Sequence, residues 1–164
     1  VIRAMELGRK HGALTLWNPA PAKVASADLL ANVDLLTPNE TETRILLGLP
    51  PDDPTPTVEL AQRLFEYGID RLVVTLGKEG ALIVTPGGNE RIPAVEISPL
   101  DPTGAGDCYI AALAVGVGKG LALSDAVRQA NYAGAFMTTR LGVIDGLPTR
   151  SQLDTFMATT RIRS

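Results

Sequence analysis

One short segment of the sequence combines residue types that could bind an anion and take part in its transfer. Residues 101–107 read Asp-Pro-Thr-Gly-Ala-Gly-Asp, so three small residues stand where a loop enters an apolar helix, and a carboxylate follows at once. Glycine lets a backbone approach an anion closely, and a helix N-terminus adds unpaired N–H donors and roughly half a positive charge. Gly104, Ala105 and Gly106 are therefore candidates for an anion hole that would stabilise a transferring phosphoryl group.

The acidic residue that closes this segment, Asp107, is poorly explained by anion binding alone. Its negative charge would repel a phosphate, but a carboxylate here could accept the proton of an attacking hydroxyl group. A purely structural interpretation stays open, because an acidic residue is favourable in the first turn of a helix and glycines form tight turns. Two common phosphate motifs do not fit: Tyr109 stands where a dinucleotide fingerprint needs glycine, and Gly120 follows Gly118-Lys119 where a P-loop needs Ser or Thr.

The composition is that of one α/β-type domain with a substantial core. The 164 residues are 45% hydrophobic and 20% charged, and the formal net charge is -3. Because the 15 Lys and Arg residues are scattered, neither a nucleic-acid nor an anionic-membrane partner is expected. The single cysteine, Cys108, cannot form an internal disulfide, and no apolar stretch approaches the roughly 20 residues that span a bilayer. These features favour a reducing, soluble compartment and a cytoplasmic protein.

Apolar periodicity in the first half of the chain predicts helices that alternate with strands. Apolar runs at 13–17 and 34–37 predict buried strands. A proline cluster at 50–56 predicts a stiff surface loop. The expected helices end at Gly12, cover about 25–33, run from an Asn39 cap to about Leu47, and run from a Thr57 cap to Gly68.

The second half predicts an antiparallel group of strands followed by helices. The strands are expected at 71–76, 81–85 and 91–97, with turns at 77–80 and 86–89. Pro93 should confine the last of these strands to an edge of the sheet. An apolar helix follows the turn at 101–106, Ser124 is expected to cap a second helix, and a last helix begins near Thr149. Alternating helices and strands predict a layered α/β sheet.

Four segments together resemble ribokinase and its sugar-kinase relatives, in the order in which that family carries them. They are Asn18-Pro19-Ala20-Pro21, Asn39-Glu40-Thr41-Glu42, Thr75-Leu76-Gly77-Lys78-Glu79-Gly80 and the segment 101–107. Because they cover nearly the whole chain, the sequence is identified as a member of the ribokinase family. The resemblance implies a three-layer α/β/α ribokinase-like (Rossmann-like) sheet that is mostly parallel and incomplete at its N-terminus.

The resemblance also implies a role for each matching residue in binding ATP and in phosphoryl transfer. Asp107 would be the catalytic base, and the backbone of residues 104–106 would be the anion hole. Asn18 and Glu42 would lie near the phosphates, with Glu42 acting through the water shell of Mg²⁺. The positions expected to line the nucleotide are Thr75, Leu76, Gly77, Lys78, Glu79, Gly80, Gly106 and Asn131.

Each of these segments has a structural interpretation as well. Asn18 could be a turn residue, Asn39 and Glu42 a helix cap with its partner, and residues 77–80 a hairpin turn. Asn131 could equally be an ordinary exposed helix residue. Four such segments in the family's order, with the acid-containing turn last, favour the family interpretation.

A monovalent cation beside the anion hole is a further implication of the resemblance, bound mostly through backbone carbonyl oxygens. The matching positions are Asp101, Thr103, Met137, Arg140 and Gly142. One departure from the family pattern is Gly146, preceded by Asp145, where many ribokinases carry a hydroxyl residue. Whether potassium is needed therefore stays open.

These residues together predict ATP-dependent phosphorylation of a sugar hydroxyl, with D-ribose converted to D-ribose 5-phosphate. The alternatives are a fructokinase, a 2-keto-3-deoxygluconate kinase, a nucleoside kinase, or a nucleotide-binding module without catalysis. Residues 1–164 are expected to be one domain, the C-terminal nucleotide-binding part of a kinase whose sugar-binding half and lid lie outside this sequence. Its partners would be ATP and a small sugar, the full-length protein would be a homodimer, and the fragment alone would have little activity.

Overall fold

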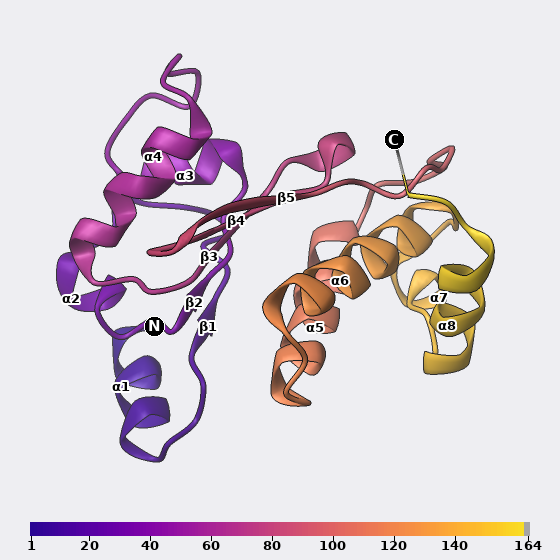
Figure 1. Ribbon diagram of the computed structural model, residues 1–164, viewed down its shortest axis with the longest axis horizontal. Helices are drawn as coiled ribbons and strands as arrows, with labels where there is room; N and C mark the ends of the chain where they lie inside the picture. Colours follow the sequence, from indigo (N-terminus) through magenta and orange to yellow (C-terminus); the bar gives the residue numbers. More distant parts are fainter. Residues whose placement is uncertain (163–164) are drawn as a thin grey trace. The chain divides into compact units, whose positions relative to one another are not determined.

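A computed structural model describes residues 1–162, and the chain divides into two compact units. The first unit comprises Val1–Leu76 and Leu82–Arg91. The second unit comprises Gly77–Ala81 and the residues from Ile92 onward. Figure 1 follows the chain through the elements of both units.

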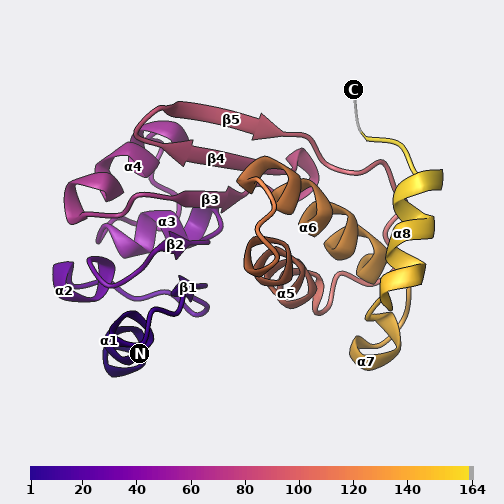
Figure 2. The same ribbon diagram turned by 60° about the horizontal axis from the view of Figure 1, so that its bottom comes forward.

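A five-stranded sheet lies almost wholly in the first unit, with the strand order β1-β2-β3-β4-β5. The strands are β1 (Leu16–Trp17), β2 (Leu35–Leu36), β3 (Leu72–Thr75), β4 (Ala81–Thr85) and β5 (Gly88–Ile92). The first three strands pair in parallel, with Leu16 opposite Leu35 and Leu36 opposite Leu72. Figure 2 shows β4 running antiparallel to both of its neighbours. The predicted parallel strands and the predicted antiparallel group are both present.

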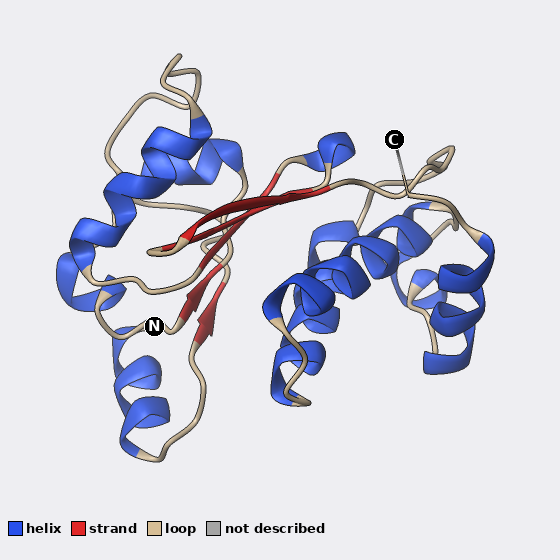
Figure 3. Ribbon diagram, in the orientation of Figure 1, coloured by secondary structure: helices blue, strands red, loops and turns tan. Residues whose placement is uncertain are grey.

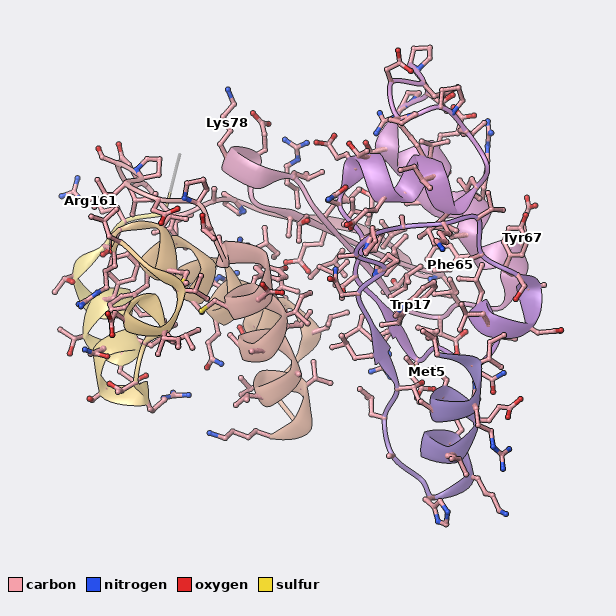
Figure 4. All side chains as sticks on the ribbon, turned by 180° about the vertical axis from the view of Figure 1, so that it is seen from behind. Met5, Trp17, Phe65, Tyr67, Lys78 and Arg161 are labelled. Atoms are coloured by element: carbon pink, nitrogen blue, oxygen red, sulfur yellow. The ribbon has the colours of Figure 1, made fainter. Side chains whose placement is uncertain are left out.

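The helices of the first unit lie on one face of this sheet (Figures 1 and 3). They are α1 (Ile2–Lys10), α2 (Ala27–Leu30), α3 (Glu40–Leu46) and α4 (Thr57–Leu64), and α4 continues into a 3₁₀ turn, η1 (Phe65–Tyr67). Leu36 and Val74 of the strands belong to one buried apolar cluster with Leu46 of α3, and Trp17 and Phe65 pack against it (Figure 4). Each such side chain contributes about 1.5–3 kcal/mol when fully buried. The apolar residues whose periodicity predicts these elements therefore also form the core.

The starts of α3 and α4 test two predicted caps. At α3 the Asn39 side chain accepts a hydrogen bond from the Glu42 N–H, and the Glu42 carboxylate accepts one from the Asn39 N–H, each at 2.8 Å. This capping box confirms the predicted helix start. The predicted Thr57 cap is wrong, because Pro56 occupies the N-cap position and Thr57 is already helical. The Thr57 hydroxyl instead donates to Glu40 Oε1 at 3.2 Å.

The second unit consists mainly of helices packed on one another. A 3₁₀ turn, η2 (Gly77–Glu79), is followed later in the chain by α5 (Ala105–Gly118), α6 (Leu123–Thr138), α7 (Val143–Gly146) and α8 (Arg150–Thr159). Edge-to-face contacts of the Phe156 ring with the rings of Tyr132 and Phe136 hold α8 against α6. None of the helices within residues 1–162 is long and apolar enough to cross a membrane.

Three details of the second half differ from the sequence prediction. β5 covers Gly88–Ile92, so the preceding turn is shorter than predicted, and Pro93, which has no N–H for a strand ladder, lies past the strand. Ser124 caps no helix, because α6 begins at Leu123 and Ser124 lies inside its first turn. The helix α7 is only one turn long and is too short for apolar periodicity to reveal.

Asp34 stabilises the amino-terminal ends of β1 and β2. Its Oδ2 atom accepts hydrogen bonds from the N–H and the hydroxyl group of Thr15, each at 2.8 Å. Partial burial acts to raise the pKa of Asp34, but the bonds from Thr15, aided by the charges of Arg9 and Arg71, outweigh it and lower that pKa below its usual value. The resulting stability is present above the pKa of the unfolded chain, about 3.9, and is lost as the pH falls through the folded pKa.

We therefore expect the Asp34→Ala variant to be less stable than the unmutated protein by about 1 kcal/mol at neutral pH, since water replaces part of the lost bonding. The difference should shrink as the pH falls below about 4, where the carboxylate of the unfolded chain becomes protonated, and should be lost once the pH is also below the lowered pKa of the folded protein. Urea unfolding followed by circular dichroism measures both effects. Asp52→Ala, in the exposed proline-rich loop, is the control. Equal losses in the two variants would contradict the role of Asp34.

Candidate functional site

The segment 101–107 forms a tight turn that leads into α5. Asp101 Oδ1 accepts a hydrogen bond from the Thr103 N–H at 2.9 Å. Hydrogen bonding by the Thr103 side chain and then by its N–H holds the pKa of Asp101 below its usual value. Gly104 occupies the N-cap position at φ 78°, a left-handed conformation that glycine adopts without strain. The N–H of Ala105 is used inside the turn, where it donates to the Pro102 carbonyl at 3.2 Å.

The start of α5 keeps backbone donors open beside a carboxylate. Within residues 1–162, the N–H groups of Gly104, Gly106 and Asp107 have no hydrogen-bond acceptor. N–H groups of the first helical turn lack partners inside the helix and carry the positive end of its dipole. The Asp107 side chain belongs to the same turn, and both Gly106 and Asp107 are exposed. The turn can therefore receive an anion and, next to it, a group that gives up a proton.

The positions predicted to bind a monovalent cation gather where this turn meets the segment between α6 and α7. The Thr138 carbonyl at the end of α6 accepts the Asp101 N–H at 3.1 Å. The Gly142 N–H, from the loop before α7, donates to the Asp101 carboxylate and contributes to its lowered pKa. Thr103 is bonded to the same carboxylate. Asp101 therefore ties together the turn, the end of α6 and the start of α7.

The remaining cation positions offer mainly backbone oxygens. The Met137 carbonyl accepts the Arg140 N–H at 3.3 Å, and the Gly142 carbonyl accepts the Gly146 N–H at 3.1 Å. A carbonyl oxygen has a second lone pair, so both can still bind another group. The Arg140 guanidinium lies 4.6 Å above the centre of the Phe136 ring. The described residues contain no cluster of three or more His, Cys, Asp or Glu side chains that could hold a metal ion.

The turn between β3 and β4 is the second predicted site. It begins with η2, and the Gly80 N–H donates to the Gly77 carbonyl at 3.1 Å. Gly80 has φ 95° and lies so close to the end of β5 that an added Cβ would be only 2.1 Å from the Ile92 carbonyl oxygen. No side chain other than the hydrogen of glycine fits there. Lys78 points away from the ribbon (Figure 4), and Lys78 and Glu79 are both exposed.

Asn131 of α6 bonds to backbone rather than facing solvent. Its Nδ2 atom donates to the Pro93 carbonyl at 3.0 Å and contacts the Ile92 carbonyl at 3.4 Å. The residue is half-buried, so it is not the ordinary exposed helix residue of the alternative interpretation. Its amide nitrogen is committed to the protein's own backbone.

The carboxyl ends of the parallel strands bring together the predicted residues of the first unit. After β1, Asn18 Nδ2 donates to the Thr37 carbonyl at 2.6 Å, just beyond β2. Asn39 forms a bridge with Thr75 at the end of β3, where the Thr75 N–H donates to the Pro38 carbonyl at 2.9 Å. Ligands of open α/β sheets bind outside the carboxyl ends of their strands. These residues therefore lie at the edge of the sheet where a ligand is expected.

The predicted positions thus fall into two sets. The first unit holds Asn18, Glu42, Thr75 and Leu76. The second unit holds Gly77, Lys78, Glu79, Gly80, Asp101, Thr103, Gly104, Ala105, Gly106, Asp107, Asn131, Met137, Arg140 and Gly142. Within each unit the structure brings distant parts of the sequence into contact.

Two residues next to Asp107 acquire properties that the sequence does not reveal. The Tyr109 hydroxyl is buried and has no hydrogen-bond partner among the described residues, and burial raises its pKa. The Cys108 thiol is buried, donates to the Ala133 carbonyl at 3.3 Å, and also has its pKa raised by burial. A buried thiol with a raised pKa is typical of a small core residue and not of a reactive nucleophile. An apolar helix pattern marks both positions only as core.

Comparison with known proteins gives a consistent picture. A family model described as pfkB family carbohydrate kinase matches residues 1–150. The ribokinase of Haemophilus influenzae is 30% identical over 154 residues, which are 94% of this chain and 50% of the relative. The solved ribokinase of Thermotoga maritima superposes with a TM-score of 0.85 at 28% identity, over 95% of this chain and 52% of that one. This likeness confirms the predicted ribokinase-like α/β fold.

A second structural relative was solved with ligands. It is a double mutant of the fructokinase of Vibrio cholerae with fructose, ADP and a potassium ion bound. It superposes with a TM-score of 0.78 at 26% identity, over 94% of this chain and 53% of that one. The chain therefore spans about half the length of each of these three relatives.

Replacing Gly104 should disturb the turn strongly. A Cβ there would adopt the strained left-handed conformation and lie 2.8 Å from Met137 Cε and 3.2 Å from Val143 Cγ1. We expect Gly104→Ala to lower the free energy of unfolding by about 2 kcal/mol. Gly106→Ala is the matched control, because its Cβ would meet nothing within 4 Å, and alanine favours a helix over glycine. Urea unfolding that finds equal losses in both variants would contradict this packing.

Removing the unpaired hydroxyl of Tyr109 should stabilise the protein. We expect Tyr109→Phe to raise the free energy of unfolding by about 1 kcal/mol, because the folded protein no longer buries a polar group without a partner. Tyr132→Phe is the opposite case, because the hydroxyl group of the buried Tyr132 donates a hydrogen bond to the Thr160 carbonyl at 3.1 Å. Loss of this bond should lower the free energy of unfolding. Thermal and urea unfolding compare the two. A destabilised Tyr109→Phe variant would mean that the hydroxyl has a partner.

Proposed function

The chain belongs to the pfkB family of carbohydrate kinases, and we propose that the protein transfers the terminal phosphoryl group of ATP to a hydroxyl group of a sugar. One observation carries the proposal: the Asp107 carboxylate stands in the first turn of α5 beside the open N–H groups of Gly104 and Gly106. Phosphoryl transfer to an alcohol needs a group that takes up the alcohol's proton, next to donors that stabilise the transferring group. This turn contains both.

The mechanism assigns different parts of the turn to different tasks. Asp107 accepts the proton of the sugar hydroxyl as the oxygen of that hydroxyl attacks phosphorus, and the bond from phosphorus to the leaving oxygen of ATP breaks. The open N–H groups donate to the phosphoryl oxygens, where negative charge is spread in the transition state. Because the turn is fixed by its own hydrogen bonds, the donors are oriented before the reaction begins.

ATP and Mg²⁺ are the cofactors of the proposed reaction. The positions proposed to line the nucleotide are Thr75 in the first unit and residues 77–80 in the second unit. Asn18 would support the strand ends that face the phosphates. Mg²⁺ bound to ATP would neutralise charge on the phosphates. Glu42 fits a role in the water shell of that ion, because the bond from the Asn39 N–H uses Oε2, and the second carboxylate oxygen can still accept.

Potassium is the monovalent cation that we assign to the positions around Asp101. The carbonyl oxygens of Met137 and Gly142 each accept one N–H and can each bind one more group. The fructokinase of Vibrio cholerae, which was solved with a potassium ion, is a structural relative. With Gly146 in place of a hydroxyl residue, the site would have to rely on backbone oxygens.

D-ribose is the acceptor that the comparisons favour, with D-ribose 5-phosphate as the product. Relatives named ribokinase match at about 30% identity over most of the chain, as for Haemophilus influenzae. Fructose is the second candidate, because the Vibrio cholerae fructokinase is a relative of similar fold. The full-length protein can be assayed with both sugars.

Asp107→Asn should abolish turnover but leave ATP binding intact. Asparagine keeps the shape of the side chain but cannot accept the proton, so we expect the rate with D-ribose to fall at least about 10³-fold. The measurement is ATP consumption by the full-length protein with D-ribose or fructose, with and without K⁺, beside calorimetry of ATP binding.

A variant that keeps near-normal rates would rule out Asp107 as the base. If the unmutated protein turns over fructose but not ribose, the mechanism holds and the acceptor is corrected. Binding of ATP without turnover of any sugar would favour the nucleotide-binding module instead.

A further inference from the structure

Asn131 is tied to the nucleotide turn by a chain of contacts within the second unit. We propose that Asn131 is a positioning residue, which holds the turn Gly77–Gly80 through the backbone of Ile92 and Pro93 and does not itself read the adenine base. The inference rests on the proposed function, because it takes that turn as part of the ATP site. It assigns a different task to a residue that the resemblance places beside the adenine.

The first contact runs from α6 to the backbone after β5. Asn131 Nδ2 donates to the Pro93 carbonyl at 3.0 Å and lies 3.4 Å from the Ile92 carbonyl. β5 ends at Ile92, and the next backbone pairing of this segment is the bridge of Val95 with Ile162. Pro93 stands between them and has no N–H to offer. Asn131 therefore bonds to the backbone where the strand ladder is interrupted.

The second contact runs from that backbone to the turn. Gly80 is buried, and its missing Cβ would lie 2.1 Å from the Ile92 carbonyl oxygen and 2.6 Å from the Ala94 nitrogen. The backbone of the turn is thus in direct contact with the backbone that Asn131 holds. The Ile92 carbonyl is common to both contacts. A shift of residues 92–94 must therefore displace Gly80, which closes the turn by its bond to Gly77.

This arrangement predicts how nucleotide binding responds to a change at residue 131. A side chain that reads a base discriminates between bases, because a wrong base leaves its donor or acceptor unpaired. A side chain that only positions the turn affects every nucleotide that uses the turn, whatever its base. The ratio of ATP to GTP affinity therefore separates the two roles.

The test uses the full-length protein and the non-hydrolysable β,γ-imido analogues of ATP and GTP, with binding measured by calorimetry. We expect Asn131→Ala to weaken both analogues by about tenfold, in line with the loss of one to two hydrogen bonds, with their ratio unchanged within about twofold. Asn131→Asp keeps the size but turns an acceptor toward two carbonyl oxygens, and should weaken both analogues at least as much. Sugar affinity should be unchanged in both variants.

Asn32→Ala is the matched control, because Asn32 also donates from Nδ2 to a backbone carbonyl, that of Asp28 at 2.8 Å, but in the first unit. It should leave both affinities unchanged. Unfolding curves establish that each variant is folded at the temperature used. If Asn131→Asp does not fold, Asn131→Ala provides the measurement, and Asn131→Ser is used if alanine fails as well.

Two results would overturn the inference. A tenfold change in the ratio of ATP to GTP affinity would show that Asn131 reads the base. Unchanged affinities for both analogues would show that its bonds are structural only. The proposed function is tested separately. If the protein binds the analogues but phosphorylates no sugar, the kinase function is refuted, and the role of Asn131 can still be measured. If the protein binds neither analogue, the kinase function and the role of Asn131 are both refuted.

Discussion

The close approach of α5 and α6 is the constraint on which the second unit depends. Three glycines make it possible: a Cβ at Gly116 would lie 2.9 Å from the Ala126 Cβ, one at Gly134 would lie 3.2 Å from the Ala105 carbonyl, and one at Gly104 would meet Met137. Interiors are packed so densely that no added methyl group is absorbed without movement. The N-terminus of α5 is therefore held at a fixed place on α6, and its open N–H groups acquire a defined direction.

Much of the fold can be predicted from the sequence where a local signal and the tertiary structure agree. The start of α3 is such a case, because Asn39 and Glu42 carry the whole capping box within four residues. Thr57 and Ser124 are the opposite case: both are good capping residues, yet Thr57 is already the first helical residue of α4, and Ser124 lies inside α6, which begins at Leu123. Residue type alone does not determine where the chain first adopts helical dihedral angles, because the position of a helix end also depends on the neighbouring residues.

The candidate site is predictable to the extent that its chemistry is local. The turn before α5 contains its donors and its carboxylate within seven residues, and its geometry is built from the same residues. The partners of Asn131 and Gly80 could not be inferred from the sequence, because both contact backbone atoms of residues 92–94. Backbone atoms are nearly the same in every residue, so residue types do not indicate these contacts. The unpaired hydroxyl of Tyr109 is hidden for a similar reason, since only the packed helices decide what surrounds it.

One helix, α6, carries the contacts of both predicted sites in its second half. Asn131 faces the backbone behind the nucleotide turn, and Met137 lies against the turn that begins α5. Their separation of six positions along the chain corresponds to about 9 Å along a helix axis. Because the rise per residue of a helix is fixed, the number of residues from Asn131 to Met137 sets the spacing between the two binding turns of the second unit. A single inserted residue would rotate one turn's contact by about 100° relative to the other.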